Sequence, residues 1–119
     1  MARSVITGRT IYEDARVHAT TAELTIRGYW LPFGAPRTIP LTALTGVSTM
    51  ARDPERPVRW PRWGRRGSAW FPLDWSRPRR GVAVALWRGD GRCVVVTPSN
   101  PGRLVALLGG LGIPEQRGA

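Results

Sequence analysis

The sequence predicts a mainly β domain that ends in one C-terminal α-helix. Residues 22–30 alternate between apolar and polar side chains, with the period of two that is typical of a half-buried strand. Residues 81–87 and 92–97 are apolar stretches on either side of a glycine-containing turn, which is the pattern of a β-hairpin. Residues 101–111 instead repeat leucine at helical spacing. The chain of 119 residues fits one domain and can enclose a modest core without disulfide bonds.

The first half of the chain predicts a series of short strands. In the 22–30 strand the even and odd positions form opposite faces: Ala22, Leu24, Ile26, Gly28 and Trp30 against Glu23, Thr25, Arg27 and Tyr29. Residues 16–20 can pair with this strand through a tight connection. The other predicted elements here are a proline- and glycine-containing turn at 31–36, a strand at 37–41, one helical turn from Leu41, Leu44 and Val47, and a strand at 45–50.

The second half begins with a basic segment, residues 52–80, which we predict to be a long loop. It contains five prolines, which fix φ and remove hydrogen-bond donors, so neither a continuous helix nor a central strand is expected. A short extended piece is expected at 69–73. The C-terminal helix can take Ser99 or Asn100 as its N-cap and Pro101 as its first residue, and glycines end it.

The formal net charge is +10, and the 52–80 segment holds nine arginines against three acids. Strong positive charge favours anionic partners such as nucleic acid, acidic lipid or an acidic protein. The sequence contains no lysine, which also fits the codon usage of a GC-rich genome. The charge alone therefore does not identify a partner.

The composition argues against an enzyme. His18 is the one histidine and lies in a predicted strand, and Cys93 is the one cysteine and is expected to be a core residue. We expect no catalytic residue, no metal ligand and no cofactor, because ligand clusters, a phosphate-binding loop and a nucleophile elbow are all missing. The first ten residues lack the apolar region of a signal peptide, and no apolar run is long enough for a membrane span. We therefore expect a cytoplasmic protein that is at most peripheral, at the inner face of the membrane.

Five features follow one another along the chain. They are strands from Ala15, the segment Arg37-Thr-Ile-Pro-Leu41, a basic loop that ends at Trp70-Phe-Pro-Leu-Asp74, the Gly89-Asp-Gly91 hairpin, and the helix that starts at Asn100-Pro101. This order resembles the bacterial pleckstrin-homology-like (PH-like) domains. The resemblance implies a partly open barrel of about seven antiparallel strands in two sheets, capped by the helix. The domain would span 15–113, between an N-terminal segment, 1–14, and a C-terminal tail, 114–119.

The resemblance also implies a typically non-catalytic scaffold that binds lipid head groups, peptides or proteins. Members that bind phosphoinositides carry clustered basic residues along the first hairpin. This sequence offers only Arg16 and Arg27 there. A phosphoinositide site at that place is therefore not expected.

The candidate binding surface is the stretch 59–80, with four tryptophans and seven arginines. Arginine makes bidentate contacts with phosphate or carboxylate, and tryptophan suits membrane interfaces, protein interfaces and stacking on bases. The predicted binding residues are Arg59, Trp60, Arg62, Trp63, Arg65, Arg66, Trp75, Arg77, Arg79 and Arg80. In the structural alternative, Trp70, Phe71 and Leu73 fold the loop back onto the barrel, and Trp60 and Trp63 stack beneath arginines.

The leading hypothesis is a non-enzymatic binding module whose basic loop engages an anionic membrane surface or an acidic protein partner. One alternative is nucleic-acid binding through the same loop, although no helix-turn-helix, zinc ligand set or ribonucleoprotein motif is present. A third hypothesis is a structural homo-oligomer, joined by edge strands and by Trp87, which is predicted to face away from the apolar side of its strand.

Overall fold

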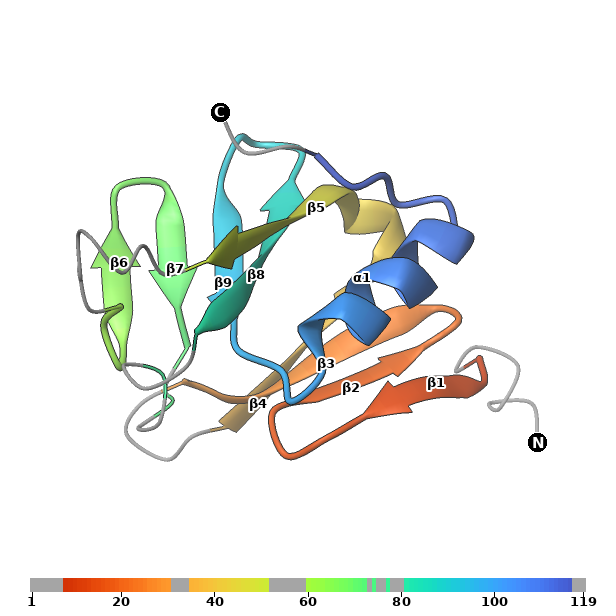
Figure 1. The fold of residues 1–119 in the computed structure, drawn as a ribbon, viewed down its shortest axis with the longest axis horizontal. Coiled ribbons are helices and arrows are strands. Elements are labelled where there is room, and N and C mark those ends of the chain that lie inside the picture. Colours follow the sequence, from red (N-terminus) through yellow and green to blue (C-terminus); the bar gives the residue numbers. More distant parts are fainter. Residues whose placement is uncertain are drawn as a thin grey trace.

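The computed structural model describes residues 8–30, 35–51, 60–72, 74, 77 and 81–116. These residues form two β-sheets and one helix, α1 (Pro101–Gly110) (Figure 1). The first sheet contains β1 (Thr10–Glu13), β2 (Val17–Thr20), β3 (Glu23–Trp30) and β4 (Ala35–Pro40). The second sheet contains β5 (Leu44–Ala51), β6 (Gly64–Arg66), β7 (Ala69–Phe71), β8 (Val82–Arg88) and β9 (Cys93–Val96). A 3-10 turn, Leu41–Ala43, connects the two sheets.

The two sheets differ in topology. The first is a meander in the order β1-β2-β3-β4, and the second has the order β5-β8-β9-β7-β6. All pairings are antiparallel except that of β7 with β9, which is parallel. The sheets share no strand in the described chain, so hydrogen bonding does not close them into a barrel.

The predicted mainly β class and the C-terminal helix are confirmed. Every predicted strand is present, with ends shifted by a few residues. Asn100, rather than Ser99, is the N-cap of α1, because its side chain accepts a hydrogen bond from the backbone N–H of Arg103 at 3.1 Å. Pro101 is the first helical residue, as predicted.

Two strands were not predicted, which brings the described residues to nine strands instead of about seven. β1 has an irregular pairing with β2 between Thr10 and Tyr12, so its sequence does not alternate cleanly. β6 and β7 form a hairpin between Pro61 and Pro72, a stretch that contains no proline. The prediction of a continuous loop is therefore wrong for this hairpin, and most of the rest of the 52–80 segment lies outside the described residues. Gly67 makes the turn at φ +60°, a conformation that glycine adopts without steric cost.

The main core lies between the two sheets and beneath α1. Leu24 and Ile26 of β3 face Val84 and Leu86 of β8 in one buried cluster. From the helix, Leu104 and Leu108 enter the same cluster and are fully buried. α1 contacts β1 of the first sheet and β5 and β8 of the second, as Figure 1 shows. The leucine spacing that predicted the helix is thus the stripe that closes this core.

A second cluster covers the other face of the second sheet. Its buried members are Phe71, Ala83, Ala85, Cys93 and Val95, and Met50, Trp60, Ala69 and Trp87 pack against it. Trp87 does face away from the main core, as predicted. However, it is only half-exposed, and its Nε1–H donates to Ser48 Oγ at 2.9 Å. This tryptophan is therefore packed, which weakens the oligomer hypothesis that used it.

The predicted outward position of Tyr29 is wrong. Leu24 and Ile26 are buried as the alternation requires, but the register of β3 against β4 shifts between Ile26 and Trp30. Gly28 lies in this shift at φ +73°, so the strand inverts its phase there. Tyr29 is consequently buried in the main core, with an exposed fraction of 3%.

Candidate anion-binding site

The structure separates the predicted binding residues into three groups. Trp60, Arg62, Trp63, Arg65 and Arg66 lie on or near the surface of the 60–72 stretch. Arg77 lies in the interior. The remaining four, Arg59, Trp75, Arg79 and Arg80, lie outside the described residues.

The described tryptophans of the segment are neither all packed nor all displayed. Trp70 packs against the main core, as the structural alternative expected, and Trp60 is half-buried against the apolar second cluster. Trp63 is 44% exposed and meets Trp70 edge-on, with ring centroids 5.6 Å apart and an interplanar angle of 80°. Trp63 is therefore the tryptophan of the described segment that can reach a partner.

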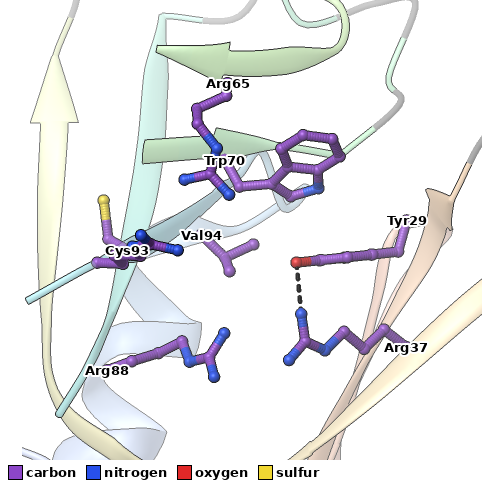
Figure 2. A pocket seen from close by; sticks show the side chains of 8 residues that line it. Tyr29, Arg37, Arg65, Trp70, Arg88, Cys93 and Val94 are labelled. Atoms are coloured by element: carbon purple, nitrogen blue, oxygen red, sulfur yellow. Dashed lines mark hydrogen bonds between the residues drawn. The ribbon is translucent and has the colours of Figure 1, made fainter. Parts of the chain in front are cut away.

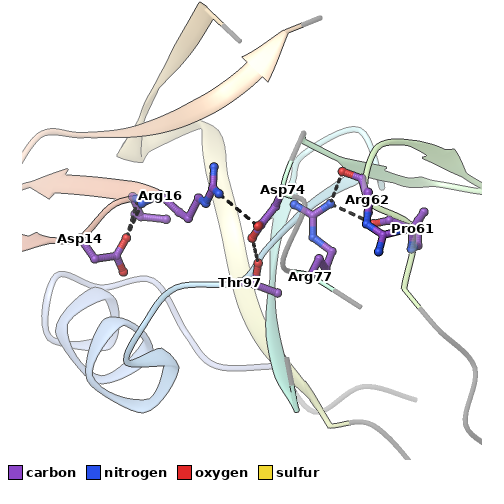
Figure 3. A network of polar contacts seen from close by, with 8 residues as sticks. Asp14, Arg16, Pro61, Arg62, Asp74, Arg77 and Thr97 are labelled. Carbon is purple, nitrogen blue, oxygen red and sulfur yellow. Dashed lines mark hydrogen bonds and ion pairs between the residues drawn. The ribbon is translucent and has the colours of Figure 1, made fainter. Parts of the chain in front are cut away.

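Arg77 is an interior residue that organises the segment. It is 1% exposed, and its guanidinium lies over the Phe71 ring, 5.5 Å from the centroid. One nitrogen donates to the backbone oxygens of Pro61 and Arg62 at 3.1 and 3.2 Å (Figure 3). Burial lowers its pKa to about 10, although the nearby Asp74 opposes this. We therefore leave Arg77 out of the binding surface.

Asp74, the one acid of the 59–80 stretch, is buried at a junction of the fold. Its carboxylate accepts from the Thr97 hydroxyl at 2.5 Å and pairs with Arg16 at 3.3 Å (Figure 3). Thr97 follows β9, and Arg16 lies between β1 and β2. Asp74 thus connects the segment to both sheets and does not offset the surface charge of the segment.

The residues most suited to bind an anion line a cavity of about 130 Å³ at one end of the space between the sheets. Its described lining is Tyr29, Arg37, Arg65, Trp70, Arg88, Arg92, Cys93 and Val94 (Figure 2). This described lining contains four arginines and no acid. Burial raises the pKa of the Cys93 thiol, so this cysteine adds no negative charge at neutral pH.

Strand alternation explains why the arginines meet. On β8, Val84 and Leu86 face the core, and Arg88 continues the same face. Arg92 lies opposite Arg88 across the hairpin, where the Arg88 backbone N–H donates to the Arg92 oxygen at 2.8 Å. On β4, Arg37 pairs with Ile26 and shares the inward face of Ile39. Each apolar stripe therefore ends in an arginine.

The aromatic side chains that line the cavity, Trp70 and Tyr29, explain the position of the fourth arginine, Arg65. Arg65 of β6 pairs with Trp70 of β7, and its guanidinium lies 5.7 Å from the centroid of the Trp70 ring. Trp70 in turn pairs with Val94 and lies 6.0 Å from the Tyr29 ring. Arg37 donates to the Tyr29 hydroxyl at 2.7 Å. The hairpin that the proline argument missed is thus the element that brings Arg65 to the cavity.

The positive charge at this cavity has little local compensation. Among the described residues, Arg65, Arg88 and Arg92 make no ion pair. Asp90, in the β8–β9 turn, accepts from the Arg92 backbone N–H at 3.0 Å, which lowers its pKa together with the charges of Arg88 and Arg92. Asp90 is exposed and does not line the cavity. Four cations around one small space make an anion the favoured occupant.

The first hairpin shows the opposite arrangement. Arg27 pairs with Glu13 at 2.7 Å, and Arg16 pairs with Asp74. Both basic residues that the sequence offers there are thus neutralised.

Sequence reasoning identified only Arg65 among the four cavity arginines. Arg37, Arg88 and Arg92 are isolated in the sequence, so no charge cluster marks them. For two of these arginines, strand alternation in the sequence could have indicated a position inside the fold. Arg37 and Arg88 each stand at the inward phase of a strand, where an apolar residue is expected.

Comparisons with protein-family models, curated proteins and solved structures found no match to this chain. Among the residues that the structure describes, no group of three histidine, cysteine or acidic residues could hold a metal ion. The ten-residue α1 is much too short to cross a bilayer, and the described chain contains no other candidate span.

Proposed function

We propose that this chain is a non-enzymatic PH-like binding module that engages an anionic membrane surface from the cytoplasmic side. The face that contacts the membrane consists of Trp63, Arg65, Arg88 and Arg92 around the cavity. The order of elements supports the PH-like assignment, because a four-stranded meander, a second sheet and a C-terminal helix follow one another. The β6–β7 hairpin is an insertion between β5 and β8 in that order.

The observation on which the proposal rests is an exposed tryptophan beside arginines that have no acidic partner among the described residues. Trp63 contacts Trp70 on the cavity wall, and Arg65 stacks on the same Trp70 ring. An indole of this kind can enter the interfacial region of a bilayer while the arginines contact head groups. Basic side chains near an anionic leaflet contribute on the order of 1 kcal/mol each. The arginines of this face and one inserted ring are then sufficient for peripheral binding.

Vesicle flotation tests this proposal. The chain is mixed with neutral phosphatidylcholine vesicles, or with vesicles that also contain phosphatidylglycerol, at low and high salt. We expect flotation with the anionic vesicles only, and less of it at high salt because screening weakens exposed charges.

A charge-matched pair of variants locates the surface. Replacing Arg65 and Arg92 by serine should weaken vesicle partitioning roughly 30-fold, since two cations are lost from the face. The control replaces two exposed arginines, Arg9 just before β1 and Arg103 on α1, and Figure 1 shows these elements apart from β6 and β7. It has the same net charge and should bind almost as wild type. Equal losses in the two variants would show that overall charge, and not this face, drives binding.

An acidic protein partner is the second candidate, because arginine and tryptophan are enriched in protein interfaces as well. Absence of flotation at low salt would reject the membrane proposal in favour of this one. Retardation of single-stranded DNA or RNA in a gel at low salt would instead favour the nucleic-acid alternative.

A further inference from the structure

We propose that the cavity lined by Tyr29, Arg37, Arg65, Arg88 and Arg92 is a binding site for one phosphate monoester group. The inference deepens the proposed function and rests on it for the membrane setting. The same chemistry could come from free phosphate or from the head group of a lipid such as phosphatidic acid. The cavity lies at the ends of β3, β4, β8 and β9 and on the β6–β7 hairpin, and Arg16 and Arg27 of the first hairpin do not line it.

The size of the cavity limits what can enter. Its volume of about 130 Å³ is on the order of four water molecules at liquid density. Sites for whole drug-sized ligands are at least about 300 Å³. A single tetrahedral oxyanion therefore fits, whereas a nucleotide or a sugar ring would have to remain outside. The occupant is thus a terminal group whose parent molecule, if any, extends into solvent.

The donors converge on one space. Figure 2 shows the guanidinium groups of Arg37, Arg65 and Arg88 reaching the cavity from three sides, with the Tyr29 hydroxyl beside them. Arg92 completes the lining. Each guanidinium presents several N–H donors in a fixed plane, the geometry that recognises phosphate oxygens in pairs. Arg37 and Arg65 are also positioned by aromatic rings, those of Tyr29 and Trp70.

Charge favours a dianion over a carboxylate. Three of the lining arginines, Arg65, Arg88 and Arg92, make no ion pair within the part of the chain that the structure describes, so a monoanion leaves most of the repulsion between these three uncompensated. A phosphate monoester carries a charge of about −1.5 to −2 at pH 7 and three acceptor oxygens. A phosphodiester carries one charge and has only two unsubstituted oxygens, so it offers the arginines less charge and fewer acceptors.

Titration with inorganic phosphate tests the pocket without any membrane. We follow the indole N–H resonances by NMR, because Trp70 lines the cavity. Saturable shifts with a Kd on the order of 1 mM or tighter are expected for an ion of five heavy atoms. Sodium acetate at the same ionic strength should produce no saturable shift. Absence of a phosphate effect beyond that of acetate would overturn the proposal.

The pH dependence supplies a second criterion. The second pKa of a phosphate monoester is about 6, whereas sulfate stays a dianion and arginine stays a cation. Lowering the pH from about 7.5 to about 5.5 should therefore weaken the binding of methyl phosphate, a monoester, several-fold and leave sulfate binding unchanged. An equal change for both ions would show that the dianion is not what is recognised.

Two variants locate the bound ion. Arg88→Gln and Arg92→Gln should each weaken phosphate binding at least about tenfold, because each removes charged hydrogen bonds. Arg103→Gln, on the exposed side of α1, is the control and should bind phosphate as wild type. Thermal melting in phosphate-free buffer identifies any variant that is unfolded. Wild-type affinity in a folded Arg88→Gln protein would exclude this cavity.

Vesicles separate this inference from the proposed function. Phosphatidic acid exposes a phosphate monoester and phosphatidylglycerol a diester, and the two are compared at equal surface charge. We expect phosphatidic acid to be preferred, and Arg88→Gln to abolish the preference. Flotation without preference and without phosphate binding would reject the pocket but keep the membrane proposal. Phosphate binding without any flotation would keep the pocket and reject the membrane proposal.

Discussion

At the scale of single residues, the same amino acid has three different roles in this protein. Arg77 is interior and bonds to backbone oxygens, Arg16 and Arg27 are paired with acids, and the cavity arginines face solvent and the cavity. Residue type and local sequence do not distinguish these roles. What distinguishes them is whether an acid or a carbonyl group from a distant segment comes within reach.

The carboxylate of Asp14 accepts four hydrogen bonds within the fold. Its carboxylate accepts from the backbone N–H groups of Arg16, Val17 and Ser99 at 2.6, 2.8 and 2.8 Å, and also from the Tyr12 hydroxyl. Burial raises the pKa of Asp14, but these hydrogen bonds outweigh it and the pKa lies below its ordinary value of 3.8. The carboxylate therefore joins the first turn to the segment before α1.

Asp14→Asn should lower the free energy of unfolding by about 2 kcal/mol at pH 7, because a charged acceptor of several hydrogen bonds is lost. The folded-state pKa is depressed, so the stabilisation is present above the unfolded-state value of 3.8 and is lost as the pH falls through the lower folded-state pKa. Urea denaturation of both proteins from about pH 7 to about pH 3 measures this. The difference between the two stabilities should begin to shrink as the pH falls below about 4, and a constant difference down to about pH 3 would contradict the pKa assignment.

At the scale of elements, single glycines decide which way a strand or hairpin presents its side chains. Gly28 inverts the phase of β3 and turns Tyr29 into the core, and Gly67 closes the hairpin that brings Arg65 to Trp70. Alternation is thus a reliable guide only between such points. It places Arg37 and Arg88 on the inward faces of their strands, but it does not predict the inward position of Tyr29.

Gly28→Ala should destabilise the protein by about 1–2 kcal/mol, because a side chain at φ +73° is strained. Gly109→Ala is the matched control, since Gly109 lies in α1 and an added methyl group there would meet no atom within 4 Å. The control should be neutral or stabilising by up to about 1 kcal/mol. Chemical denaturation measures both. A neutral Gly28→Ala variant would mean that β3 can change phase without this glycine.

At the scale of the whole molecule, the basic segment is part of the fold and not an appendage. Asp74 bonds to Thr97 beside the second sheet and to Arg16 in the first, and its backbone N–H donates to the Arg62 oxygen at 2.9 Å. The segment that supplies Arg65 to the cavity is therefore fixed to both sheets. Its position should depend on this one buried carboxylate.

Asp74→Asn should cost about 3 kcal/mol, because it leaves the buried Arg77 and the partly buried Arg16 without their anionic neighbour. Asp90→Asn is the control, an exposed carboxylate whose loss should cost less than about 0.5 kcal/mol. Denaturation followed by tryptophan fluorescence and by far-UV circular dichroism measures both variants. Equal, small costs would show that the segment folds independently of the junction.

By itself, the sequence determined the fold class, the main strands, the hairpin at 81–97 and the capped helix. These depend on periodicity and on local capping, which act over a few neighbouring residues. The sequence also located a basic, tryptophan-rich segment, but it could not separate the buried Arg77 from the cavity-lining Arg65. Only the tertiary structure brought Arg37, Arg65, Arg88 and Arg92 together. They come from β4, β6, β8 and the residue before β9, and strand pairing over long sequence distances, with its bulges, decides where such residues meet.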